Sequence, residues 1–137
     1  METNQLILEK VSPYGFDKTV ELLTAEAERR HWMIPATHDL QASLAKSGKA
    51  VRSVKVLEIC KPVYSGQLLE KNDERIVSVI MPCRISIYLK EDDRTYVAFW
   101  DGERLAAGLP ENVREVMIAA SDEMNQIVDS VIKQIIT

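Results

Sequence analysis

The sequence predicts an α+β fold in one compact domain, and three observations carry this prediction. The chain has 137 residues, a usual size for a single domain, so residues 1–137 are expected to share one core. Residues 83–100 alternate between apolar and polar side chains around a central turn, which is typical of an antiparallel hairpin. From Glu111 onward, apolar residues recur every three or four positions, which predicts a long C-terminal helix packed against a mixed or antiparallel sheet.

The N-terminal part predicts two strands, each followed by a helix. Residues 6–11 form the first strand, which ends where proline and glycine punctuate the backbone. A helix follows to about Arg30, because its apolar positions step by four, three and four. Residues 32–36 give the second strand, which its proline restricts to an edge or to the strand end. Capping side chains at residues 37–39 then open a short helix that ends near Gly48.

The central part predicts a third strand, a helix and the hairpin. Residues 54–59 are rich in β-branched side chains and form the third strand. A helix over about residues 63–70 begins beside a proline, which is favoured at a first helical position. An apolar stretch at residues 76–81 stops at a second proline, and the hairpin strands 83–89 and 96–100 follow.

The apolar residues of the predicted C-terminal helix form a stripe over about 25 positions, which corresponds to a helix nearing 40 Å. Because a small domain is shorter than this, we expect part of the helix to extend beyond it. The stripe is wide, because Ile118, Ile132 and Ile136 lie beside it. A helix this apolar usually has two buried contacts. We interpret one contact as the sheet and the other as a partner subunit, which predicts a homodimer. The alternative is a core helix that its own chain covers completely.

Charge and composition exclude several classes of protein. The net charge of −4 argues against a nucleic-acid partner, because phosphate binding depends on Lys and Arg. Five basic residues cluster between Lys46 and Lys61, which either attract a small anion or form a solvated face. No apolar run is long enough to span a membrane, and the first residues lack the features of a secretion signal. We therefore expect a cytoplasmic protein with no membrane partner.

The sequence lacks the motifs of several enzyme classes but contains two cysteines and two histidines. There is no Gly-rich phosphate loop, HExxH motif or GxSxG elbow. Cys60 precedes Lys61 and Pro62, so it is predicted just before a helix N-terminus, where oriented N–H groups and the adjacent ammonium would favour a reactive thiolate. The alternative is that Cys60 is a small buried apolar residue.

Three residues could form a Cys/Cys/His metal site if the fold brings them together. Cys83 alternates in register with Ile85 and Ile87, which predicts that it points into the core. His38 lies between a strand end and a helix start, where it serves either a site or a local hydrogen bond. Spacing along the sequence does not by itself support a metal site at His38, Cys60 and Cys83.

Two segments resemble a known family. The segment Glu58-Ile59-Cys60-Lys61-Pro62 and the later segment Met81-Pro82-Cys83-Arg84-Ile85 are similar to motifs of the domain of unknown function 302 family. Members of that family carry Cys-Asn-Pro or Gly-Asn-Pro after a central strand, so Lys61 stands where asparagine is usual. The resemblance implies a compact α+β fold with a curved sheet, commonly as a homodimer. It implies no established reaction, and any cofactor stays open.

Three functions follow as hypotheses. The first is a dimeric binding module that holds a small ligand or a metal in a cleft near His38, Cys60 and Cys83, with Lys61 and Arg84 supplying positive charge. The second is a thiol-based enzyme or sulfur carrier in which Cys60 is the nucleophile and His38 the base. The third is a structural interaction protein that works through its last helix.

Overall fold

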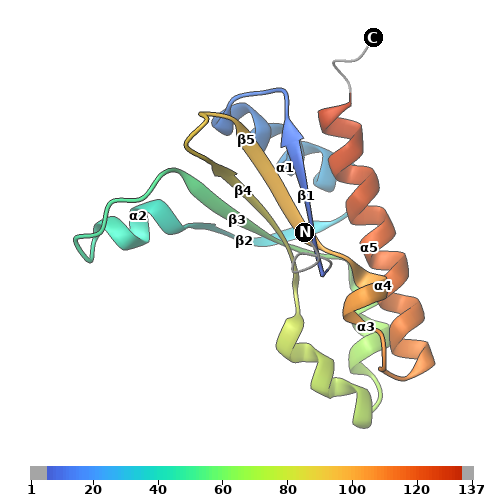
Figure 1. The fold of residues 1–137 in the computed structure, drawn as a ribbon. Coiled ribbons are helices and arrows are strands. Elements are labelled where there is room, and N and C mark those ends of the chain that lie inside the picture. Colours follow the sequence, from blue (N-terminus) through green and yellow to red (C-terminus); the bar gives the residue numbers. More distant parts are fainter. Residues whose placement is uncertain (1–5, 134–137) are drawn as a thin grey trace.

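The computed structural model describes residues 6–133, and it confirms an α+β domain built on one five-stranded sheet (Figure 1). The elements, in chain order, are β1 (Ile7–Ser12), α1 (Phe16–Arg29), β2 (Met33–Asp39), α2 (Leu40–Ala45), β3 (Val54–Cys60), α3 (Pro62–Leu69), the 3₁₀ helix η2 (Asp73–Ile80), β4 (Cys83–Leu89), β5 (Thr95–Trp100), α4 (Gly102–Leu105) and α5 (Glu111–Ile132).

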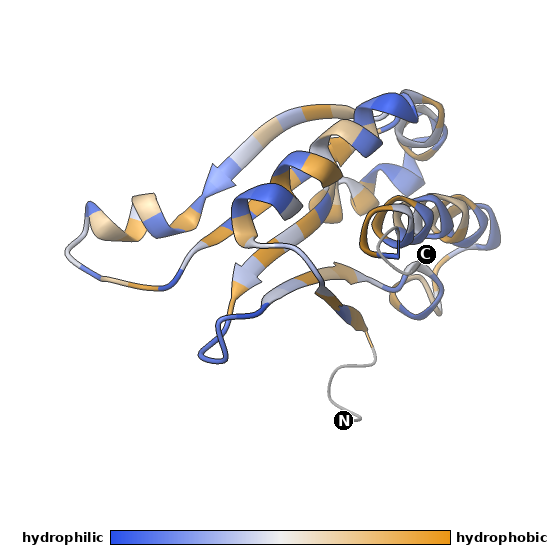
Figure 2. Ribbon diagram, turned by 90° about the horizontal axis from the view of Figure 1, so that it is seen from above, coloured by the Kyte–Doolittle hydropathy of each residue, from blue (hydrophilic) through white to orange (hydrophobic). Residues whose placement is uncertain are grey.

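The sheet has the strand order β1-β5-β4-β3-β2, and every neighbouring pair is antiparallel. The predicted hairpin is confirmed, with Leu89 of β4 opposite Thr95 of β5. The strands bend along their length, so the sheet is curved as the resemblance implied (Figure 2). β2 is longer than predicted, and a break in its register between Met33 and Ala36 accommodates Pro35 on this edge strand.

The core lies between one face of the sheet and the helices α1 and α5, which run over that face (Figure 2). Alternate side chains of β3, β4 and β5 point into it, because successive residues of a strand face opposite sides. The helices contribute residues at spacings of three and four. The largest fully buried apolar side chains are Leu23, Leu57, Ile59, Ile85, Ile87, Met124, Ile127 and Val128.

Helix α5 spans 22 residues, which is about 33 Å, and its apolar stripe is covered by the chain itself. It contacts α1 along one part, and α3 and α4 along the part that extends beyond the sheet (Figure 1). Between residues 6 and 133, the strongly exposed large apolar side chains lie on other elements, and none lies on α5. Internal contacts therefore account for the width of the stripe up to Ile132, whereas Ile136 lies outside the described residues. The homodimer stays a prediction.

Helix α4 was not expected, and it depends on Gly102. A Cβ atom at this position would lie 2.4 Å from the main-chain oxygen of Met117 and 2.5 Å from Cβ of Ser121. The N–H of Gly102 also donates a 2.9 Å hydrogen bond to Oγ of Ser121. Only glycine permits this close approach of α4 to α5.

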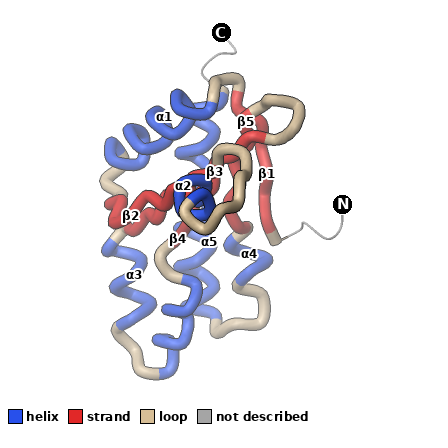
Figure 3. The backbone as a smooth tube through the Cα atoms, turned by 90° about the vertical axis from the view of Figure 1, so that its left-hand side faces the viewer, coloured by secondary structure: helices blue, strands red, loops and turns tan. Residues whose placement is uncertain are grey.

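The connection around α2 projects from the body of the domain (Figure 1) and is seen end-on in Figure 3. Residues 40–50 are all exposed, and the main contact of α2 is with β3. We call residues 40–50 the α2 arm. Within the described part of the chain, no helix has the length and apolar character needed to cross a membrane.

Candidate functional site

The site begins where β3 ends and β4 starts, because these strand ends carry the two cysteines. Cys60 is the last residue of β3, and Cys83, the first residue of β4, lies opposite Ile59 in the register. Both thiols are reduced and half-buried. Burial, together with the nearby Cys60, raises the pKa of Cys83 to about 12, so Cys83 is a neutral thiol at physiological pH.

Helix α3 starts immediately after Cys60, as predicted. Lys61 is its N-cap residue, and Pro62 occupies the first turn, where its missing N–H has no cost. The first turn of α3 brings Ser65 next to the thiol of Cys60. Oγ of Ser65 lies 3.4 Å from both Sγ of Cys60 and the main-chain oxygen of Lys61. The first turn of α3 therefore fixes one wall beside the cysteine.

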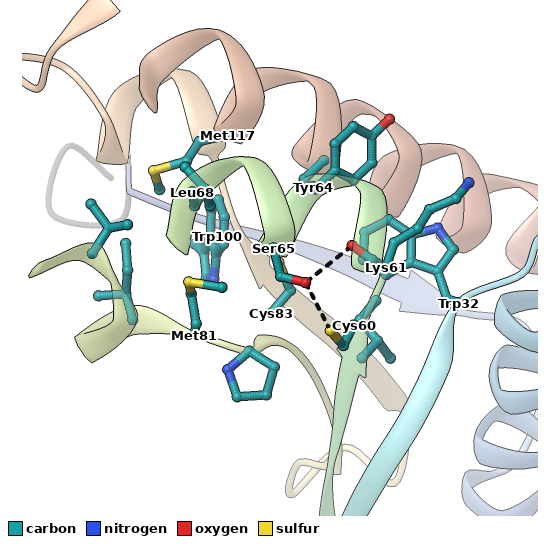
Figure 4. A pocket seen from close by; sticks show the side chains of 15 residues that line it. Trp32, Cys60, Lys61, Tyr64, Ser65, Leu68, Met81, Cys83, Trp100 and Met117 are labelled. Atoms are coloured by element: carbon teal, nitrogen blue, oxygen red, sulfur yellow. Dashed lines mark hydrogen bonds between the residues drawn. The ribbon is translucent and has the colours of Figure 1, made fainter. Parts of the chain in front are cut away.

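The two cysteines line a cavity of about 40 Å³ between the end of the sheet and the helices α3, η2 and α5 (Figure 4). Its surface is mostly apolar, with Leu68 and Val77 on one side and aromatic rings on others. Both tryptophans of the protein lie there. The side chains that are not simple hydrocarbons include Trp32, Cys60, Tyr64, Met81, Cys83, Trp100 and Met117.

The rim of the cavity is held by Glu123 of α5. Its carboxylate accepts hydrogen bonds from Nζ of Lys61 at 2.8 Å, from Nε1 of Trp32 at 3.0 Å and from the hydroxyl of Tyr64. Partial burial opposes ionisation of Glu123, but these three donors outweigh it, so its pKa is lowered. Partial burial and the same carboxylate raise the pKa of Tyr64 to about 12. The charge of Lys61 is thus balanced within the protein.

His38 and Arg84 lie away from this cavity. Nε2 of His38 is 2.7 Å from Oε2 of Glu58, and Nη2 of Arg84 is 3.9 Å from the same oxygen. Glu58 lies on β3 between the buried residues Leu57 and Ile59, so its side chain points to the other face of the sheet. Of the five predicted site residues, the structure brings together Cys60, Lys61 and Cys83.

The predicted Cys/Cys/His metal set is not assembled. Over residues 6–133, the structure contains no group of three or more His, Cys, Asp or Glu side chains that could hold a metal ion. The reason is the register of the sheet, which pairs His38 with Val56, several residues before the cysteine at the end of β3.

Several cavity residues were missed by sequence reasoning. Met81 and Met117 are far apart in sequence, and Glu123 belongs to a helix whose predicted role was apolar. A signal was available for Trp32 and Tyr64, since aromatic residues with a polar atom need a hydrogen-bond partner when buried. No spacing rule connects either of them with residue 123.

The fold and the site define a small α+β domain with an apolar cavity that contains thiols at one end of an antiparallel sheet. The chain belongs to the family described as domain of unknown function DUF302, whose model matches residues 8–131. The resemblance drawn from the two cysteine segments is thereby confirmed.

The fold is also found among solved structures. An example is the crystal structure of an uncharacterized conserved protein DUF302 from Bacillus stearothermophilus, which superposes with a TM-score of 0.83 at 16% sequence identity. The match covers 92% of this chain and 98% of the other. A comparison with curated proteins found no match.

Proposed function

We propose that this protein is a small binding module whose ligand occupies the cavity between α3, η2 and the end of the sheet. The observation that carries the proposal is that both cysteines of the chain, from different strands, line one mostly apolar cavity. Apolar cavities with a few polar or reactive groups are the usual form of a ligand site. A volume of about 40 Å³ restricts an unaltered cavity to a very small ligand.

Charge does not select this ligand. Lys61 is paired with Glu123, and Arg84 lies near Glu58 on the other face of the sheet. The cation that could have attracted an anion is therefore already neutralised. An uncharged ligand, or a cation whose charge is balanced by deprotonated thiols, fits the cavity better than an organic anion.

The alternative of a thiol-based enzyme is less well supported. A nucleophilic Cys60 needs a base within hydrogen-bond reach, and His38 instead pairs with Glu58. Tyr64 lines the cavity, but its pKa of about 12 makes it a poor base at neutral pH. The hydroxyl of Ser65 is the group that contacts the thiol of Cys60.

Xenon is a suitable probe because it is apolar and small. We expect xenon pressure to shift the methyl NMR signals of cavity residues in the wild-type protein. Val77→Phe should fill the cavity and abolish these shifts, because Val77 is 5% exposed and lines it. Val79→Phe is the matched control, since Val79 lies on the same 3₁₀ helix and is 83% exposed. Equal xenon responses in both variants would contradict the proposed site.

The proposed assembly is a homodimer, formed through the α2 arm in place of α5. Leu40 and Leu44 are about 40% exposed on this arm, and Lys46 and Lys49 give it a positive charge opposite to the net charge of the chain. Sedimentation velocity should give twice 15.5 kDa for the wild type and 15.5 kDa for the double variant Leu40→Glu and Leu44→Glu. A wild-type mass of 15.5 kDa at micromolar concentration would exclude the dimer.

A further inference from the structure

The cavity is unusual in its content of sulfur. The chain contains two cysteines and five methionines, and four of these seven side chains line this one cavity. They are Cys60, Met81, Cys83 and Met117, and they come from β3, the segment after η2, β4 and α5 (Figure 4). Four elements therefore converge to place thiols and thioethers around a single small space.

The other possible metal donors at the cavity are few or already engaged. Among the described residues that line it, none is His, Asp or Glu. The hydroxyl of Tyr64 donates to Glu123, and Nζ of Lys61 is paired with the same carboxylate. Hard cations such as Mg²⁺ and Ca²⁺ require oxygen ligands, and structural zinc sites take four nitrogen or sulfur ligands from Cys and His. This donor set suits neither.

Soft donors select a soft cation. Thiolate and thioether ligands favour Cu(I) over the divalent ions that prefer oxygen or imidazole. We propose that the cavity binds one Cu(I) ion between the thiolates of Cys60 and Cys83, with the thioethers of Met81 and Met117 as the surrounding soft donors. This inference rests on the proposed function, because it names the ligand of the same cavity.

The volume suits this cation, and the charge of the bound unit follows from the ligands. Binding forms two copper–sulfur bonds and releases the two thiol protons to solvent, so the bound unit carries one negative charge. Lys61 lines the same cavity, but its ammonium is already paired with Glu123 and does not neutralise this charge. A volume of about 40 Å³ accommodates a bare ion, and the lining around it is mostly apolar.

The test is a Cu(I) titration of the full, reduced chain under anaerobic conditions, with bicinchoninate as competitor. We expect one Cu(I) per chain, with quenching of fluorescence because both tryptophans line the cavity. Cys60→Ser and Cys83→Ser should each weaken binding at least about 100-fold, and Met81→Leu or Met117→Leu about tenfold. Met33→Leu is the matched control, because Met33 is 57% exposed on β2, and it should leave the affinity unchanged.

Two results would overturn the proposal. The first is a wild-type chain that does not compete with bicinchoninate for Cu(I), and the second is a Cys60→Ser or Cys83→Ser variant that retains wild-type affinity while its circular dichroism shows a folded protein. In either case, a positive xenon response would leave the proposed binding function intact. Loss of the xenon response together with normal Cu(I) binding would contradict the apolar-ligand test and support the Cu(I) site. The two proposals therefore fail separately.

Discussion

Lys61 and Glu123 join the start of α3 to the middle of α5 through an ion pair of 2.8 Å. Both side chains are about three-quarters buried, and Lys61 also lies 5.9 Å from the ring centroid of Trp32. The pair connects the residue that follows the cysteine of β3 with the helix that closes the cavity. Its loss should therefore affect both the stability of the fold and the shape of the site.

Replacement of Glu123 by Gln should lower the free energy of unfolding by about 1–3 kcal/mol, because three partly buried donors lose a charged acceptor. The neighbouring substitution Asp122→Asn, at an exposed position, removes the same charge and should change stability by less than about 0.5 kcal/mol. Urea unfolding followed by circular dichroism measures both. Equal effects of the two substitutions would show that the network around Glu123 adds nothing.

Glu26 predicts a pH dependence of stability. Hydrogen bonds from Arg29 and Arg30 outweigh the effect of burial and lower the pKa of Glu26 to about 2. A carboxylate whose pKa is lower in the folded state stabilises the fold above its unfolded pKa, and this stabilisation is lost as the pH falls toward 2. Glu26→Gln should thus be less stable than the wild type by about 1–2 kcal/mol at pH 7, with a gap that closes from about pH 4.5 downward.

The measurement is urea unfolding of both proteins between pH 7 and pH 2.5. Glu28→Gln serves as control, because Glu28 lies on the same helix but is exposed. A stability gap for Glu26→Gln that stays constant over this range would show that its carboxylate keeps an ordinary pKa.

The two thiols should differ in their rates of alkylation. Cys83 has a pKa raised to about 12, so little thiolate exists at pH 8, whereas Cys60 lies at the start of α3 beside Lys61. We expect iodoacetamide to modify one thiol per chain quickly, and Cys60→Ser to remove this fast phase while Cys83→Ser retains it. Mass spectrometry of the digested protein assigns the modified residue. A faster reaction at Cys83 would reverse this order.

Gly102→Ala should destabilise the protein by about 2–4 kcal/mol, because the added methyl group would lie 2.4 Å from the main-chain oxygen of Met117. Gly66→Ala is the matched substitution, since it lies within α3 and has open space at its Cβ position. It should be neutral or stabilise by up to about 1 kcal/mol, because alanine favours helices. Thermal unfolding of the two variants distinguishes the cost of the close approach from the general effect of the added methyl group.

The sequence predicts the sheet and its main helices because their signals are local. Alternation at residues 83–89 and the three- and four-residue steps of α1 and α5 each follow from the geometry of one element. The position of Cys60 before α3 was predicted in the same way, from the proline that opens the helix. These features depend on a few residues that are adjacent in the chain.

The composition of the cavity could not be predicted, because it depends on contacts between distant segments. Strand register and helix packing decide whether His38 or Met117 lies near Cys60. Neither can be inferred from the sequence of a single segment. The apolar width of α5 had two valid interpretations, a partner or internal neighbours. The internal neighbours α3 and α4 are known only from the packing of the helices, and the pattern of α5 alone does not reveal them.

Residues 61–82 join two adjacent antiparallel strands that a short turn could have connected, and they contribute α3 and η2 as two walls of the cavity. The main-chain pairing of β3 with β4 does not involve this excursion, but Lys61 and Tyr64 connect it to Glu123 of α5. The site therefore lies where an insertion on a hairpin meets the scaffold, because residues 61–82 supply two walls and the strand ends supply the thiols of Cys60 and Cys83. Exchange of this segment for that of another family member should alter the ligand preference and leave the strand order unchanged, and the stability should depend on whether the new segment keeps the donors to Glu123.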